Sequence, residues 1–309
     1  MISVLFYGTS DFAVPILEAL VTDPRFHVVG VVTQPDRPSG RHKRLTESPI
    51  KLAAKKFQLP VFQFEYVKSD EAFEQLRSIK ADVAVVASFG QIIPQRVLDL
   101  TPSGALNVHG SILPNYRGAS PIAAAIKHGD AITGFTYMKM DALMDHGPIL
   151  SGEKIVIEPQ DTTESLSKKM AAASAVGIAD ALIHFVNQDS KLIDQDHAQA
   201  TRCKLLSRED GLLNPTVSTA AELERTIRAY DPWPGTYLMI EGQRLKILTS
   251  QVAKGKTSLA PGTRTISENL PGIVCSDGQI LLLINLQVEG KKPLDGATFL
   301  RGKKGWAQT

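Results

Sequence analysis

Short apolar runs alternate with helix-like segments along the first half of this chain, and this alternation restricts the fold more than any other feature. The apolar runs are residues 2–7, 27–32, 81–87 and 105–109. The segments with apolar residues at helical spacing are residues 12–20, 69–79 and 119–127. Because strands buried on both faces are typical of parallel sheets covered by helices, the pattern predicts an α/β domain with a Rossmann-like, mostly parallel, doubly wound sheet.

The second half of the chain has a different texture. Residues 132–140 and 149–157 are expected to extend the sheet as a strand pair, and residues 163–186 to form a long helix capped by Thr162 or Thr163. The polar residues 189–206 are expected to be a linker. Beyond a short helix at 220–228, strand-like runs punctuated by glycine follow at 237–240, 245–248, 272–275 and 280–286. We therefore expect a first domain at 1–188 and a small OB-like β-barrel domain at 207–309.

The composition of the 309 residues is that of an ordinary globular protein, with 43% apolar and 21% charged residues. The formal net charge of +2 excludes a polyelectrolyte, so any nucleic-acid surface must be a local patch. Cys203 and Cys275 are too far apart for a C-x-x-C site, and a disulfide framework is excluded. We see no signal peptide and no apolar run near the ~20 residues of a membrane helix, and therefore expect a cytoplasmic protein with no membrane association.

The densest polar cluster lies at the end of the fourth predicted strand. Asn107 and His109 alternate along that strand, so both side chains face the same way. Farther along, a loop after a strand holds Asp141 and Asp145, either of which could orient or charge the imidazole. The alternative is structural, because a histidine at a strand end and aspartates in turns commonly serve packing and turn hydrogen bonds.

Other kinds of chemistry lack their motifs. No metal-ligating spacing and no nucleophile elbow occur, so neither a metal nor a covalent acyl-enzyme is expected. The first strand is followed by a turn at Gly8 without the G-x-G-x-x-G spacing, which argues against a dinucleotide oxidoreductase.

A basic loop follows the second predicted strand. It carries Arg37, Arg41, Lys43 and Arg44 against the single carboxylate of Asp36. Such a loop beside the polar cluster would suit phosphate groups, although a solvated surface loop has the same composition.

Together these segments resemble the methionyl-tRNA formyltransferase family. The likeness is carried by Gly8-Thr9 with Phe12-Ala13, by residues 33–41, by Asn107-Val-His-Gly-Ser-Ile-Leu-Pro with Tyr116-Arg117-Gly118-Ala119, by Arg228-Ala-Tyr-Asp-Pro-Trp-Pro-Gly, and by residues 286–293. The Asn-x-His-x-Ser-x-Leu-Pro stretch marks folate-dependent formyltransferases in general. The basic loop and the Asp-Pro-Trp-Pro segment narrow the likeness to the tRNA enzymes.

The resemblance implies transfer of a formyl group from 10-formyltetrahydrofolate, the formyl donor, to the α-amino group of methionyl initiator tRNA, with no metal. It implies a catalytic trio of Asn107, His109 and Asp145. It implies folate contacts at Phe89, Gly90, Gln91, Ile92, Ser111, Ile112, Leu113, Pro114 and Asp141. It implies tRNA contacts at Arg37, Arg41, Lys43, Arg44, Lys291, Lys292 and Arg301. The partners are then the tRNA and the folate, and we expect a monomer.

Two residues depart from the family pattern near Asp145. Ala142 stands where glycine is usual, which would matter if that position needed a positive φ, and His146 adds a second imidazole. Three alternatives stay open from the residues alone. They are a folate-dependent formyltransferase acting on an amino sugar nucleotide, a formyltetrahydrofolate hydrolase, and a non-catalytic nucleic-acid-binding protein.

Overall fold

The computed structural model describes residues 1–39, 44–303 and 305–307 of the chain. The chain forms two compact units. The first comprises Met1–Pro121, Ile132–Val156 and Ser167–Cys203. The second comprises Ile122–Ala131, Ile157–Leu166 and Lys204–Thr309.

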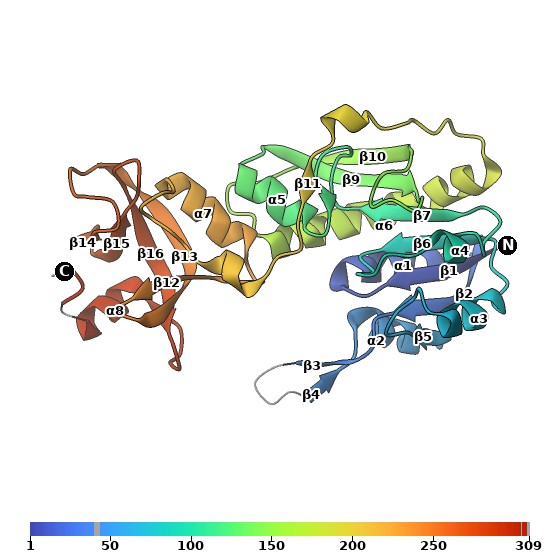
Figure 1. Ribbon diagram of the computed structural model, residues 1–309, viewed down its shortest axis with the longest axis horizontal. Helices are drawn as coiled ribbons and strands as arrows, with labels where there is room; N and C mark the ends of the chain where they lie inside the picture. The colour runs from blue at the N-terminus through green and yellow to red at the C-terminus, as the bar shows by residue number, and fades with distance from the viewer. Residues whose placement is uncertain (40–43, 304, 308–309) are drawn as a thin grey trace. The chain divides into compact units, whose positions relative to one another are not determined.

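The first unit is built on a large sheet with the strand order β10-β9-β7-β6-β1-β2-β5 (Figure 1). Its parallel strands are β1 (Ile2–Gly8), β2 (Phe26–Thr33), β5 (Val61–Gln63), β6 (Val83–Ala87) and β7 (Ala105–His109). The antiparallel strands β9 (Ile132–Lys139) and β10 (Ile149–Val156) close one edge. The predicted mixed α/β architecture is thereby confirmed, with the expected strand pair at the edge.

Helices cover this sheet, and the sequence explains where they begin. They are α1 (Val14–Thr22), which follows a short 3-10 turn, α2 (Pro49–Lys56), α3 (Asp70–Arg77) and α4 (Gln95–Leu98). Ser48 and Ser69 accept hydrogen bonds from the backbone of the first turns of α2 and α3, as N-cap residues do. All five residues of β6 and all five of β7 are buried, which explains the unbroken apolar sequence of β6, whereas β7 also buries Asn107 and His109.

Helix α6 (Thr163–Asn187) corrects the expectation that no segment is long and apolar enough to cross a membrane. Among the described residues it is the one helix that passes that test by length and composition. Its buried residues include Met170, Ser174, Ile178 and Leu182, which are four residues apart and so share one face. The hydroxyl of Tyr137 on β9 donates to the carbonyl of Ser174. The apolar face of α6 therefore packs as a core helix does.

The segment predicted as a linker, residues 189–206, lies mostly inside the first unit. Ile193 pairs with Ile149 on β10. After a 3-10 turn at His197–Gln199, the short strand β11 (Arg202–Cys203) pairs in parallel with β8 (Arg117–Gly118). The prediction of a linker rested on local composition. It missed that polar side chains of this segment, such as Gln195 and His197, bond Arg117 in the first unit.

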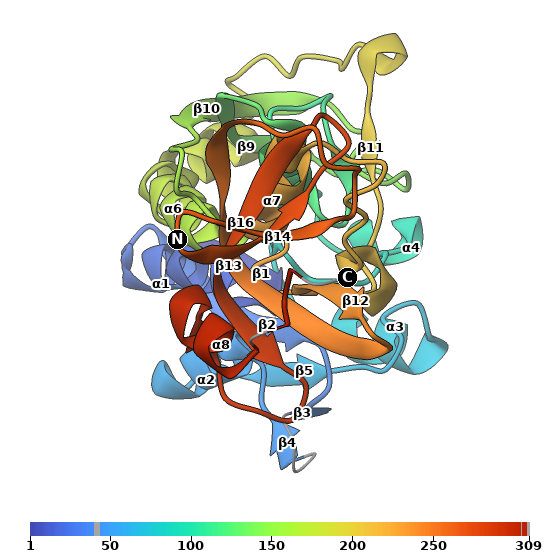
Figure 2. The same ribbon diagram turned by 90° about the vertical axis from the view of Figure 1, so that its left-hand side faces the viewer.

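The second unit is an antiparallel β domain with the strand order β12-β13-β16-β15-β14. Its strands are β12 (Thr236–Ile240), β13 (Gln243–Lys256), β14 (Arg264–Ser267), β15 (Leu270–Val274), β16 (Gln279–Val288) and β17 (Leu294–Asp295). Figure 2 shows β13 and β16 as long, curved neighbours, and α7 (Ala220–Ala229) and α8 (Gly296–Gly302) lie with them. Helix α5 (Pro121–His128) belongs almost entirely to this unit.

Candidate active site

Asn107 and His109 lie in the last three residues of β7, and both are largely buried. They are two residues apart on a strand, so their side chains leave the sheet on the same face. Within the described part of the chain, no hydrogen bond involves the side chain of Asn107, and its amide atoms are not sealed from solvent. An amide in this state has its donors free for a ligand.

Both ring nitrogens of His109 have partners. Nε2 lies 3.0 Å from the backbone carbonyl of Tyr116, and a carbonyl can only accept, so Nε2 carries a hydrogen. Nδ1 lies 3.5 Å from Oδ1 of Asp145. Nε2 therefore donates to the Tyr116 carbonyl, and Nδ1 faces the carboxylate of Asp145.

The backbone is strained at Asp145 and Tyr116, the two partners of His109, and also at Ser88 after β6. Oδ2 of Asp145 accepts a hydrogen bond of 2.7 Å from the backbone N–H of Gly118. Asp145 itself has a φ of 51°, Tyr116 a φ of 56° and Ser88 a φ of 46°. Residues other than glycine rarely adopt this left-handed conformation, and where they do the strain tends to accompany a functional site.

Among the described residues, neither departure from the family pattern makes a hydrogen bond or ring contact with His109. His146 Nδ1 bonds Oδ2 of Asp141 at 2.7 Å, and its ring stacks on that of His197 with 4.0 Å between centroids. Ala142 does not have a positive φ; the left-handed residue of this loop is Asp145. Neither departure therefore contacts the side chains of the trio.

The segment at residues 88–94 gives a mixed outcome for the predicted folate contacts. The Phe89 ring is buried in the core edge-to-face with Tyr7, and its contact with folate remains a prediction. The amide of Gln91 is used by the backbone of Val67 and Phe64. Gly90 and Ile92 are exposed.

The turn after β7 divides in the same way. Ser111 and Leu113 are buried: the Ser111 hydroxyl donates to the Asn115 carbonyl, and the Leu113 N–H bonds Thr136. Ile112 and Pro114 are half-buried, so their side chains are within reach of a ligand. Asp141 is also partly accessible, although His146 occupies one of its oxygens.

Comparison with known proteins decides the family. The Formyl transferase family model matches residues 1–182, and the model for the Formyl transferase C-terminal domain matches residues 205–304. The methionyl-tRNA formyltransferase of Desulfotalea psychrophila is 41% identical over 307 residues, which cover 99% of this chain and 94% of that protein. The one from Chloroflexus aggregans is 40% identical and covers 97% and 96% of the two chains.

The chain belongs to the methionyl-tRNA formyltransferase family.

Solved structures of formyltransferases share the fold of this family member. The N-formyltransferase from Helicobacter canadensis, solved with folinic acid and dTDP-3-aminofucose, has a TM-score of 0.68 at 17% identity, covering 92% of this chain and 99% of that one. A sugar 3-N-formyltransferase solved with dTDP and 5-N-formyl-tetrahydrofolate has a TM-score of 0.67, covering 94% and 99%. At this identity the likeness concerns the fold alone.

The basic loop of this formyltransferase is partly visible. Strands β3 (Arg37–Ser39) and β4 (Arg44–Thr46) form a small ribbon. Arg37 pairs with Glu65 at 2.8 Å, whereas Arg44 is exposed. Arg41 and Lys43, two of the predicted tRNA contacts, lie outside the described residues.

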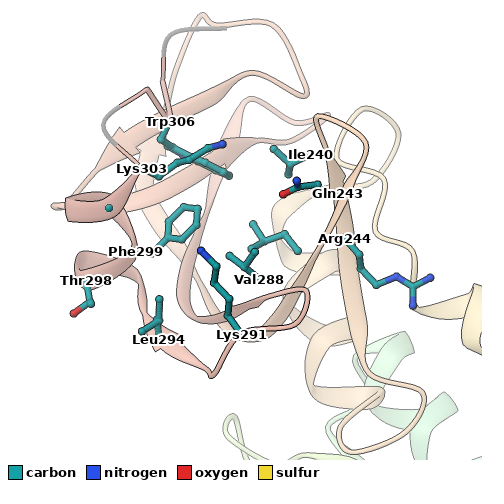
Figure 3. Close-up of a pocket in the computed structure, with 12 residues that line it drawn as sticks. Ile240, Gln243, Arg244, Val288, Lys291, Leu294, Thr298, Phe299, Lys303 and Trp306 are labelled. Carbon is teal, nitrogen blue, oxygen red and sulfur yellow. The ribbon is translucent and has the colours of Figure 1, made fainter.

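Among the predicted tRNA contacts of the second unit, Lys291 is exposed and lines a cavity of about 210 Å³ (Figure 3). Figure 3 shows Lys291 rising between Phe299 and Val288, while Arg244 points away. Lys292 and Arg301 are exposed nearby in sequence, and Arg301 bonds the Thr298 hydroxyl. The three cations remain predictions as tRNA contacts.

Sequence reasoning gave no role to Tyr116, Gly118 and Gln195, which contact the trio or its loop. It also gave none to Arg117, which bonds Gln195. Tyr116, Arg117 and Gly118 were noticed as part of a family motif, and their positive-φ turn and glycine could have suggested a backbone contact. Gln195 carried no signal, because it lies in a polar segment interpreted as a linker.

Proposed function

We propose that Asn107, His109 and Asp145 carry the transfer of a formyl group from 10-formyltetrahydrofolate to the α-amino group of methionyl initiator tRNA, giving N-formylmethionyl-tRNA for translation initiation. One observation supports this most: the Asn107 amide, which has no hydrogen-bond partner among the described residues, lies on the same strand face as His109, whose ring is 3.5 Å from Asp145. An amide donor and an imidazole thus lie on the side of the strand where, in this proposal, a negative oxygen would form.

The reaction forms a bond between the amine nitrogen and the formyl carbon, and breaks the bond from that carbon to the folate nitrogen. The formyl oxygen becomes negative in between. Nδ2 of Asn107 donates to this oxygen, and a donor of this kind is typically worth about 3 kcal/mol of barrier. The amine loses a proton and the departing folate nitrogen gains one, so the reaction consumes no net proton.

Both ring nitrogens of His109 have partners in this arrangement. Its Nε2 hydrogen is directed at Tyr116 and its Nδ1 at Asp145, so neither nitrogen is free without a rearrangement. The formyl oxygen would compete with the Tyr116 carbonyl for the Nε2 hydrogen. Asp145 orients the His109 ring and, in this proposal, accepts the proton that the amine loses.

The folate lies, in this proposal, against the two loops that carry exposed apolar side chains. The side chains of Ile92, Leu143 and Met144 are 67%, 61% and 49% exposed. Apolar side chains exposed together in this way often mark a ligand-binding surface. The bases of the two loops share one core, because Met140 packs on the cluster that holds Phe89 and Ile93. An aromatic ring system with polar edges suits such a surface, with polar contacts from Asp141 and from the backbone at Gly90.

The tRNA is bound, in this proposal, by the phosphate-binding cations. Arg44, Arg41 and Lys43 serve the acceptor end, and Lys291, Lys292 and Arg301 serve the tRNA backbone. The protein works as a monomer in the cytoplasm.

An assay with 10-formyltetrahydrofolate tests the proposal. Methionyl initiator tRNA should be formylated, whereas uncharged tRNA and a UDP-amino sugar should not. Formylation of the sugar in preference to the tRNA, or release of formate without an acceptor, would replace the proposal with one of its alternatives.

A further inference from the structure

Gln195 uses every hydrogen-bonding position of its side chain although it lies in the segment expected to be a linker. The residue is only 6% exposed. Its Nε2 donates to the carbonyl of Asp145 at 3.0 Å and to that of Gly147 at 2.7 Å. Its Oε1 accepts from Nε of Arg117 at 3.0 Å and from Nη2 at 2.6 Å.

The orientation of this amide is fixed by its partners. Arg117 has donors only, so the oxygen of Gln195 must face it, and the nitrogen must face the two carbonyls. Arg117 is itself 4% exposed, and Nη2 also bonds Nδ1 of His197 at 2.9 Å. The guanidinium and the amide therefore hold each other in one geometry.

The two carbonyls that Gln195 binds belong to Asp145, the left-handed residue of its loop, and to Gly147, two residues farther along. Asp145 has a φ of 51°, a conformation that a loop abandons readily unless its neighbours hold it. Gln195 thus hydrogen-bonds to the backbone of Asp145, and the N–H of Gly118 hydrogen-bonds to its carboxylate.

These contacts form a closed ring that includes His109. Arg117 stands in the chain between Tyr116, whose carbonyl accepts from His109, and Gly118, whose N–H donates to Asp145. From Arg117 the ring continues through Gln195 back to the Asp145 backbone. A shift of Gln195 would therefore change the distance between His109 and Asp145.

We propose that Gln195 is a positioning residue for formyl transfer, holding the Asp145 loop so that the carboxylate faces His109. The inference rests on the catalytic role proposed above for Asp145. It assigns Gln195 to the rate of the reaction and not to the binding of either substrate.

Two variants separate positioning from a merely structural role. Gln195→Glu keeps the acceptor for Arg117 but removes the donors to the two carbonyls, and Gln195→Met keeps the length of the side chain and removes both. Misplacing a catalytic group slightly can cost roughly ten- to a hundred-fold in rate, so both variants should lower kcat by at least about ten-fold with KM for tRNA and folate little changed. If Gln195 only satisfies Arg117, Gln195→Glu should retain full kcat, and that result would overturn the inference.

A double-mutant cycle tests whether the effect passes through Asp145. In an Asp145→Asn background, single-turnover rates should fall less than about two-fold further when Gln195→Glu is added, because coupled residues do not add. A full, independent loss would overturn the inference. Failure of the proposed function looks different, because the unmodified protein would then not formylate methionyl-tRNA at all.

Discussion

Gly118 donates its backbone N–H to Oδ2 of Asp145 over 2.7 Å, and nothing larger than glycine fits at that position. Its φ is +117°, and a Cβ would lie 2.1 Å from the carbonyl oxygen of Cys203 on β11. The close pairing of β8 with β11 and the hydrogen bond to the Asp145 carboxylate therefore depend on the same missing side chain.

Gly118→Ala should accordingly damage stability and rate together. A residue forced into such a conformation costs on the order of 1–3 kcal/mol, and the added methyl must also push β8 away from β11. We expect a lower melting temperature and a lower kcat. Gly302→Ala is the matched control, because its Cβ would meet nothing. An unchanged melting temperature for Gly118→Ala would contradict the packing described.

Arg44→Ala should weaken the use of tRNA without affecting the folate. Arg44 is exposed on β4, and no ion pair of its side chain occurs within the described ranges. Losing one phosphate contact should raise KM for tRNA and reduce the slope of log affinity against log salt by about 1. Arg77→Ala is the control, since Arg77 is an exposed arginine paired with Glu74 on α3. Equal effects of both changes on tRNA use would mean that Arg44 binds no phosphate.

Asp82→Asn should destabilise the protein at neutral pH but hardly at low pH. The Ser3 hydroxyl and N–H both donate to Oδ2 of Asp82 at 2.7 Å, and these bonds lower the pKa of the carboxyl below its usual value. A carboxyl with a lowered pKa stabilises the fold above its unfolded-state pKa, and this contribution disappears as the pH falls through the lowered folded-state value.

Urea unfolding at several pH values measures this. The gap in unfolding free energy between the natural protein and Asp82→Asn should be largest at pH 7 and should close under acid conditions. A gap that does not depend on pH would show that the charge of Asp82 contributes nothing.

The sheet could be predicted from the sequence where burial alone dictates the pattern. β6 and β7 are buried along their whole length, and such strands are continuous runs of uncharged residues. Short or exposed elements were missed: α2 is amphipathic but brief, and β5 has only three half-buried residues. The full length of β13 was missed as well, because most of its residues are exposed and its apolar positions are sparse.

The candidate site could be predicted only in part. The period of a strand placed Asn107 and His109 on one face, which needed no family knowledge. Asp145 came from the resemblance, because a loop has no period that would bring its carboxylate to His109. Gln195 was out of reach, since its role depends on tertiary contacts with Arg117 and with two backbone carbonyls.

The single-turnover rate of formyl transfer to methionyl initiator tRNA by Asn107→Ala tests the central claim most directly. Because the Asn107 amide has no partner within the described residues, its loss should leave the melting temperature nearly unchanged. Because the amide is an oxyanion donor in this account, the rate should fall roughly a hundred- to a thousand-fold. Asn187→Ala, at the exposed end of α6, is the matched control and should react at the full rate. A folded Asn107→Ala protein that formylates the tRNA at the natural rate would contradict the account.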